Sequence, residues 1–125
     1  MSDTEVRVLT VDDQVVFRDA ARDVINATAG FESVGGVGSG EEAMVEVERL
    51  RPELVLLDVR MPGCGGVEAA RRITAAHPDT VVVLISIEEF AEDARDSGAV
   101  ALVRKQDFGP AMLRSIWQAH GRAHV

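Results

Sequence analysis

Five short apolar segments, rich in β-branched residues, alternate along the chain with segments of helical periodicity, and this alternation constrains the fold most strongly. The apolar segments are Val6 to Val11, Phe31 to Gly36, Leu54 to Leu57, Val81 to Ile85 and Val100 to Val103. Continuous apolar strands separated by helices are typical of a parallel sheet that is covered on both faces. The pattern therefore predicts an α/β fold with a doubly wound, five-stranded parallel sheet.

Helix signals occupy the segments between these strands. Ser39 stands three residues before Glu42, which is the spacing of a capping box, and it opens a helix that extends to about Leu50. A short acidic helix is expected from about Glu88 to Asp96, and a last helix from about Phe108 to His120. Apolar residues at helical spacing define one face of the first helix: Phe17, Ala20, Ala21, Val24 and Ile25.

The size and composition of the chain suit a single domain. With 125 residues, 46% of them hydrophobic, we expect one domain over residues 1–125 with its core at about 6–120. The formal net charge of −8 argues against direct binding of nucleic acid or an anionic membrane, because phosphate groups are repelled. The single cysteine excludes an internal disulfide, and no apolar run has the roughly 18–20 residues of a membrane span. A soluble, cytoplasmic protein is expected.

Polar side chains follow four of the five predicted strands at the point where each strand ends. Asp12 and Asp13 follow the first strand, Asp58 the third, Ser86 the fourth and Lys105 the fifth. Because parallel strands end at one edge of the sheet, where ligands bind, these side chains are expected to converge. Carboxylate oxygens without histidine or cysteine favour Mg²⁺, and a neighbouring ammonium and hydroxyl suit a transferring phosphoryl group.

Each of these residues also has an ordinary structural explanation. An acidic pair after a strand is often a helix cap, and a single aspartate before a glycine-rich turn is often structural. A serine at a strand end is usually a turn residue, and a single lysine usually belongs to the solvated surface. Their joint occurrence at successive strand ends is what favours a functional site.

These residues resemble the receiver domain of two-component response regulators. Leu9-Thr10-Val11-Asp12-Asp13 is similar to the acidic first loop of that family, and Leu56-Leu57-Asp58-Val59-Arg60-Met61-Pro62-Gly63 is similar to its phosphoacceptor segment. The resemblance extends from Val6 to about His120 and implies the flavodoxin-like strand order 2-1-3-4-5. Arg18 and the segment Val59-Arg60-Met61-Pro62 are most similar to receivers of LuxR-type DNA-binding regulators.

The resemblance implies a role for each residue of the site. Asp58 would accept a phosphoryl group from a phosphohistidine of a sensor histidine kinase. Asp13, Asp58 and the backbone carbonyl of Arg60 would bind Mg²⁺ directly, and Asp12 would contribute through a metal-bound water. Ser86 and Lys105 would contact the phosphoryl group. Such a domain is a switch that assists its own phosphorylation and dephosphorylation rather than an enzyme in the usual sense.

Several positions bear on how this chain differs from its relatives. Leu102 stands three residues before Lys105, where many relatives carry an aromatic switch residue. Ser86 and Lys105 are 19 positions apart, about three fewer than the family implies, so the helix between them is expected to be nearly one turn shorter. Arg60 and Glu88 each lie two positions beyond a site residue, and we expect them to pair over the site and tune the phosphoryl lifetime.

Two other functions remain as alternatives. A Mg²⁺-dependent phosphatase with an aspartyl-phosphate intermediate usually needs an aspartate two residues after the nucleophile, where this chain has Arg60. A receiver-like module that binds proteins without using phosphate is the stronger alternative, given Leu102 and the shortened helix. The expected setting is the bacterial cytoplasm. The output would be a C-terminal DNA-binding domain outside this chain or a protein target, and a homodimer is possible.

Overall fold

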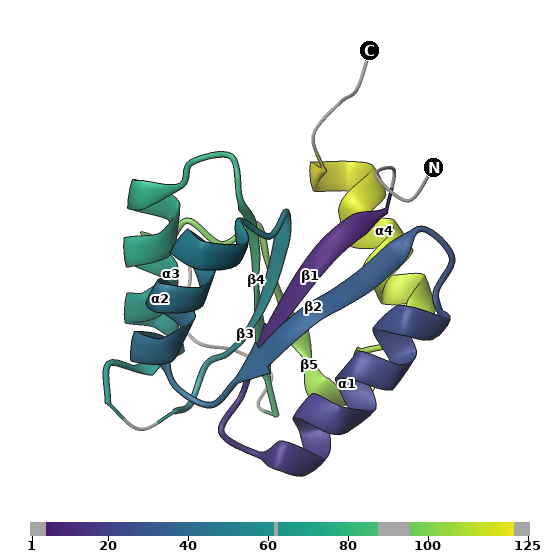
Figure 1. Cartoon of the computed structure of the whole chain (residues 1–125), viewed down its shortest axis with the longest axis horizontal. Helices are drawn as coiled ribbons and strands as arrows, with labels where there is room; N and C mark the ends of the chain where they lie inside the picture. Colours follow the sequence, from purple (N-terminus) through teal and green to yellow (C-terminus); the bar gives the residue numbers. More distant parts are fainter. Residues whose placement is uncertain (1–4, 62, 88–95, 122–125) are drawn as a thin grey trace.

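A five-stranded parallel sheet forms the centre of the computed structural model, which describes residues 5–61, 63–87 and 96–121. The strand order is β2-β1-β3-β4-β5, as predicted (Figure 1). All four strand pairs are parallel. The strands are β1 (Val6–Val11), β2 (Phe31–Val37), β3 (Leu54–Asp58), β4 (Val81–Ser86) and β5 (Ala101–Arg104).

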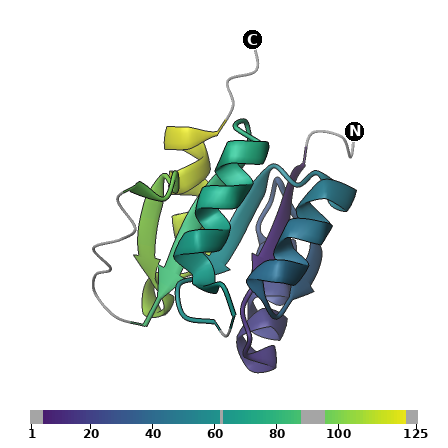
Figure 2. The same cartoon turned by 90° about the vertical axis from the view of Figure 1, so that its left-hand side faces the viewer.

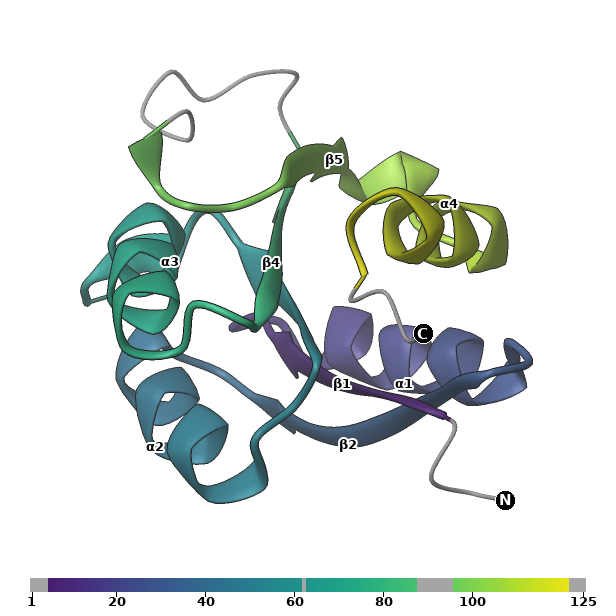
Figure 3. The same ribbon diagram turned by 90° about the horizontal axis from the view of Figure 1, so that it is seen from above.

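Helices cover both faces of this sheet, so the predicted doubly wound arrangement is confirmed. Seen from above, α1 and α4 lie on one side of the strands and α2 and α3 on the other (Figure 3). The side view places α2 and α3 next to each other on their face (Figure 2). The bounds are α1 (Val15–Ala27), α2 (Gly40–Leu50), α3 (Gly65–Ala76) and α4 (Pro110–His120), with a 3-10 turn at Lys105–Asp107.

The core has two layers because successive side chains of each strand point to opposite faces. In β3, Leu54 and Leu56 pack on the α1 and α4 side, whereas Val55 and Leu57 pack on the α2 and α3 side. All four are at most 1% exposed. Burying an apolar side chain of this size contributes roughly 1.5–3 kcal/mol, so the strands are the main source of stability.

Helix starts follow the local signals in the sequence. The Ser39 hydroxyl accepts a hydrogen bond from the Glu42 backbone N–H at 3.1 Å, which confirms the predicted start of α2. The last helix begins at Pro110, two residues later than expected, because Gly109 is its N-cap and proline is favoured in a first turn. Ala20, assigned to the inner face of α1, is exposed, whereas Ala21 and Ile25 are buried.

One helix expected from the sequence is not tested by this structure. The short helix expected from Glu88 to Asp96 falls, apart from Asp96, outside the described residues. Among the described residues no helix is long and apolar enough to cross a membrane.

The register of the sheet determines where the polar strand ends meet. Val11 lies beside Leu57, and Asp58 lies beside Ile85. Ser86 in turn lies beside Arg104, the residue before Lys105. The carboxyl ends of β1, β3, β4 and β5 therefore meet along one edge.

Candidate functional site

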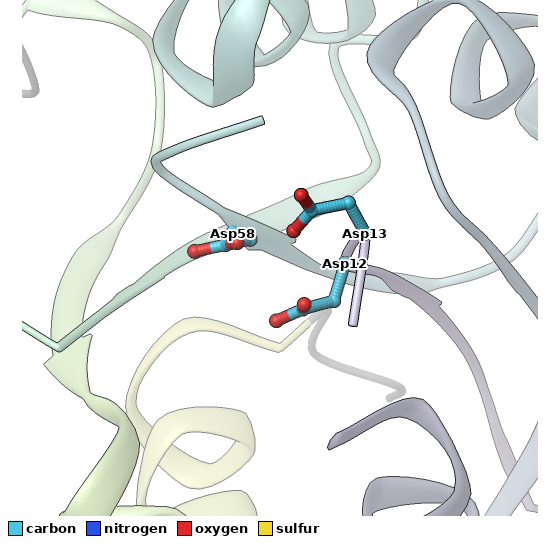
Figure 4. Close-up of side chains that lie close together, drawn as sticks. All are labelled: Asp12, Asp13 and Asp58. Carbon is cyan, nitrogen blue, oxygen red and sulfur yellow. The ribbon is translucent and has the colours of Figure 1, made fainter. Parts of the chain in front are cut away.

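Three carboxylates gather at this edge. Asp12 and Asp13 follow β1, Asp58 is the last residue of β3, and each offers a carboxylate oxygen within 4.8 Å of the others (Figure 4). Asp12 is fully buried and Asp58 is 7% exposed, whereas Asp13 is exposed. Two of the three charges are thus removed from water, which is unfavourable without a compensating positive charge.

Lys105 supplies part of that positive charge. Its Nζ lies 2.8 Å from Oδ2 of Asp12, and its side chain is 14% exposed. The contact is an ion pair without the direction of a hydrogen bond, so this buried Oδ2 has no hydrogen-bond donor among the described residues. The other oxygen, Oδ1, accepts a hydrogen bond from the Gln14 backbone N–H at 2.8 Å.

The raised pKa of Asp58 indicates that Lys105 does not neutralise the carboxylate cluster. The pKa of Asp58 is raised from its ordinary 3.8 to about 6, first because burial disfavours the carboxylate and then because Asp12 and Asp13 repel it. Lys105 and the Arg60 backbone N–H, 3.4 Å from Oδ1, act in the opposite direction on this pKa but do not cancel the effect. A bound cation would relieve this repulsion.

The residues present fit a magnesium ion. The cluster offers oxygen ligands only, and one buried oxygen, Oδ2 of Asp12, lacks a hydrogen-bond donor in the described part of the chain. Hard oxygen ligands in a solvent-accessible site suit Mg²⁺, which retains several of its own waters. The arrangement agrees with the cluster predicted from the sequence.

A pocket of about 250 Å³ opens over the cluster. Ser86, which ends β4 and is 3% exposed, contributes to its wall together with Ile87. The full lining is Asp13, Gln14, Asp58, Arg60, Ser86, Ile87 and Lys105. The structure thus brings two of the three expected carboxylates, the hydroxyl and the ammonium to one cavity, and the third carboxylate, Asp12, lies within 4.8 Å of the other two.

The structure places Arg60 and Leu102 in different surroundings. Arg60 lines the pocket, but Glu88 falls outside the described residues, so the expected Arg60–Glu88 pair stays a prediction. Leu102 is half-buried and packs against the apolar layer below α2 and α3. The side chain three residues before Lys105 is thus aliphatic and belongs to the apolar core.

A close contact between Gly66 and the end of β3 holds Asp58 in place. A side chain at Gly66 would overlap the carbonyl oxygen of Asp58, so only glycine allows α3 to begin there. The Gly66 N–H donates to the Val59 carbonyl at 3.0 Å, and the Val59 N–H donates to the Ile85 carbonyl at 2.9 Å. These bonds tie the end of β3 to both α3 and β4.

Three residues on the segment after Asp13 contribute contacts that sequence reasoning did not assign. Arg18 donates from Nη1 to the Asp12 carbonyl at 2.6 Å and passes over Gly36, where a Cβ would lie 3.4 Å from its Cδ. Gln14 and Phe17 contact Lys105. The available signal was that Gln14, Phe17 and Arg18 follow the acidic pair at helical spacing, three to four residues apart.

Comparison with known proteins agrees with this geometry. A family model described as the response regulator receiver domain matches residues 8–117. The response regulator GacA of Pseudomonas viridiflava is 40% identical over 84 residues, which are 67% of this chain and 39% of GacA. The transcriptional regulatory protein YxjL of Bacillus subtilis is 32% identical over 119 residues, which are 93% of this chain and 55% of YxjL. The chain thus spans about half or less of the length of these relatives.

Solved structures share the fold closely. The signal receiver domain of NarL from Mycobacterium tuberculosis has a TM-score of 0.85 at 26% identity, covering 94% of this chain and 98% of that one. The response regulator domain of Thermotoga maritima CheB has a TM-score of 0.83 at 29% identity, covering 96% of this chain and 99% of that one. The fold, the acidic cluster and the family match together show that the chain belongs to the receiver domain family of two-component response regulators.

Proposed function

We propose that this domain is a phosphorylation-controlled switch in which Asp58 accepts a phosphoryl group from the phosphohistidine of a sensor histidine kinase. The observation that supports it most is the convergence of Asp58, Ser86 and Lys105 on one pocket beside Asp13. The bacterial cytoplasm is the proposed setting, in keeping with the bacterial relatives GacA and YxjL.

The proposed transfer moves one phosphoryl group between two nucleophiles. An oxygen of the Asp58 carboxylate forms a bond to phosphorus while the phosphorus–nitrogen bond of the phosphohistidine breaks. The bonding electron pair returns to the imidazole nitrogen. Lys105 and the Ser86 hydroxyl would contact the phosphoryl oxygens, where negative charge is spread during transfer. Mg²⁺ held in the cluster would supply further positive charge for these oxygens.

The different exposure of the three carboxylates supports different roles for them in metal binding. Asp13 is exposed and lines the pocket with Asp58, which favours direct coordination by these two and by the Arg60 backbone carbonyl. Asp12 is buried, does not line the pocket and pairs with Lys105, which favours contact through a metal-bound water.

Phosphorylation would change the charge at Asp58 and thereby change the conformation of a surface away from the pocket. A phosphoryl group on Asp58 adds negative charge and acceptor oxygens, which attract Ser86 and Lys105 and bias a two-state surface. Because Leu102 cannot act as an aromatic switch, the coupling in this chain would rest on Lys105 more than in many relatives. Arg60, with Glu88, would set how long the phosphoryl group lasts.

The output would be a DNA-binding domain outside this chain, as in LuxR-type regulators, or a separate protein target. A structural neighbour is a DNA-binding response regulator of the LuxR family from Staphylococcus aureus, with a TM-score of 0.83 at 24% identity, covering 92% of this chain and 98% of that one, which shows a shared fold. The receiver itself would not touch nucleic acid because its net charge of −8 opposes that contact. A homodimer is one form that the switched state could take.

Intact-mass measurement after incubation with acetyl phosphate tests this proposal. We expect one phosphoryl adduct in the wild-type protein with Mg²⁺, and none with a chelator or in Asp58→Ala. Glu32→Gln, an exposed change on β2, is the matched control and should retain the adduct. No adduct in the wild type, together with no binding of beryllofluoride, would contradict the switch and favour the phosphate-independent interaction module.

A further inference from the structure

The side chain of Lys105 is held by groups of the α1 segment as well as by Asp12. Its Nζ lies 3.4 Å from Oε1 of Gln14 and 4.6 Å from the centroid of the Phe17 ring. With the ion pair to Asp12 at 2.8 Å, three groups surround one ammonium. Without such contacts, the flexible four-carbon side chain of a lysine would not favour a single position.

The Phe17 ring is itself fixed in place. It packs against Phe108 with the ring centroids 5.7 Å apart and the planes at 60°, within the range of favourable aromatic pairs. The Phe108 backbone N–H donates to the carbonyl of Lys105 at 3.2 Å, at the end of the 3-10 turn. This turn therefore brings Phe108 and the Lys105 side chain to the same aromatic ring.

Phe17 packs against the apolar layer on the α1 and α4 side of the sheet. Val24, seven residues and about two turns further along α1, is also half-buried and packs against the same apolar layer. A cation over an aromatic face is attracted by the ring's quadrupole, most strongly where water is partly excluded, and Lys105 is only 14% exposed. Phe17 differs from Val24 in offering such a face to the pocket lysine.

We propose that Phe17 is a positioning residue that keeps the Lys105 ammonium at the pocket, beside Asp12 and ready for a phosphoryl group on Asp58. This inference rests on the proposed function, because the position of Lys105 matters there only if Asp58 is phosphorylated. Phe108 supports it by holding the ring. In a chain with Leu102 at the usual aromatic position, Phe17 offers an aromatic face to the Lys105 ammonium.

The rate of phosphorylation by acetyl phosphate at saturating Mg²⁺ measures this role. Phe17→Leu keeps an apolar side chain but removes the ring, and we expect the rate constant to fall about three- to tenfold. Phe17→Tyr retains the aromatic face and should restore most of the rate. Val24→Ala is the matched control on α1, expected to lower stability while leaving the rate unchanged. Equal rates in wild type and Phe17→Leu would overturn the proposal.

A double-mutant cycle separates positioning from a general structural defect. If Phe17 acts through Lys105, Phe17→Leu should cause no further loss of rate in a Lys105→Met background. The same fold-loss in both backgrounds would show that the ring acts on the pocket independently of the lysine, and would overturn the assigned role.

A measurement without phosphorylation keeps this inference separate from the proposed function. The ring current of Phe17 should move the Lys105 Hε proton signals upfield in the wild-type protein, and this shift should disappear in Phe17→Leu. Unchanged Lys105 signals would contradict the positioning role even if Asp58 is phosphorylated. A wild-type protein that shows the shift but gains no phosphoryl group would instead contradict the proposed function alone.

Discussion

Leu57 and Asp58 are consecutive residues of β3, yet they belong to regions with opposite energetics. Leu57 is fully buried among apolar neighbours and stabilises the fold. Asp58 is 7% exposed, and its pKa is raised to about 6 because its charge is poorly solvated and repelled by Asp12. The strand interiors therefore provide stability, whereas the strand ends hold unfavourable charge that a cation or a change of protonation can relieve.

The largest effect is expected from a substitution in the apolar region. Leu84 lies in β4 and is fully buried, so Leu84→Ala should lower the free energy of unfolding by about 3–4 kcal/mol through lost burial and a cavity. Urea denaturation measures this change. A loss below about 1 kcal/mol would mean that the sheet core is not the main source of stability.

A smaller effect is expected where the two regions meet. Gly66→Ala would force a methyl group against the Asp58 carbonyl, and we expect a loss of about 2 kcal/mol as α3 and the end of β3 move apart. Gly109→Ala is the matched control, because a Cβ there meets nothing within 4 Å and its φ of 173° is ordinary extended backbone. Equal losses in the two variants would contradict the close contact at Gly66.

In the charged region, removing a charge should stabilise the protein. Because the folded-state pKa of Asp58 lies near 6 and its ordinary value is 3.8, the folded protein binds the extra proton between these values. The contribution of Asp58 to wild-type stability should therefore fall as pH rises from about 4 to 6. Asp58→Asn removes this fall and, allowing for solvent screening, should gain about 1–2 kcal/mol at neutral pH without metal.

Thermal or urea unfolding of the two proteins across this pH range, with a chelator present, tests the prediction. The difference between wild type and Asp58→Asn isolates Asp58 from the other titrating groups. A variant that is less stable than wild type at neutral pH would show that the carboxylate is well compensated, and that Asp58 does not oppose folding as Leu57 favours it.

An effect in the same range is expected from the metal. A tenfold excess of Mg²⁺ over its dissociation constant should stabilise the wild-type protein by about 1.4 kcal/mol, because only the folded chain assembles the cluster. Asp13→Asn should lose most of this gain, whereas the control Glu32→Gln should retain it. Identical stabilisation of all three proteins by Mg²⁺ would indicate binding away from the cluster.

The sequence predicts the position of the site because strand ends are marked by abrupt changes of residue type. The step from Leu57 to Asp58 and the step from Ile85 to Ser86 are visible in the sequence, and parallel order brings such steps to one edge. Strand order 2-1-3-4-5 was implied by the resemblance to receivers rather than by these residues, and the structure confirms it.

The details that the sequence does not predict depend on side-chain directions in three dimensions. Asp12 and Asp13 are adjacent and alike, yet the first is buried against Lys105 and the second is exposed, because neighbouring residues leave a strand on opposite sides. Phe17 fits the pattern of a core residue, and only the course of the chain after β5 brings the Lys105 ammonium over its ring. Ala20 is exposed because it lies at the margin of the apolar face of α1.

The most direct test of the central claim locates the phosphoryl group by chemistry. Borohydride reduces an aspartyl phosphate to homoserine, so treatment after incubation with acetyl phosphate and Mg²⁺ marks the acceptor for peptide mapping by mass spectrometry. The predicted result is homoserine at position 58, dependent on Mg²⁺ and absent at Asp12 and Asp13. Homoserine at another aspartate, or none under conditions that give a phosphoryl adduct, would contradict Asp58 as the acceptor.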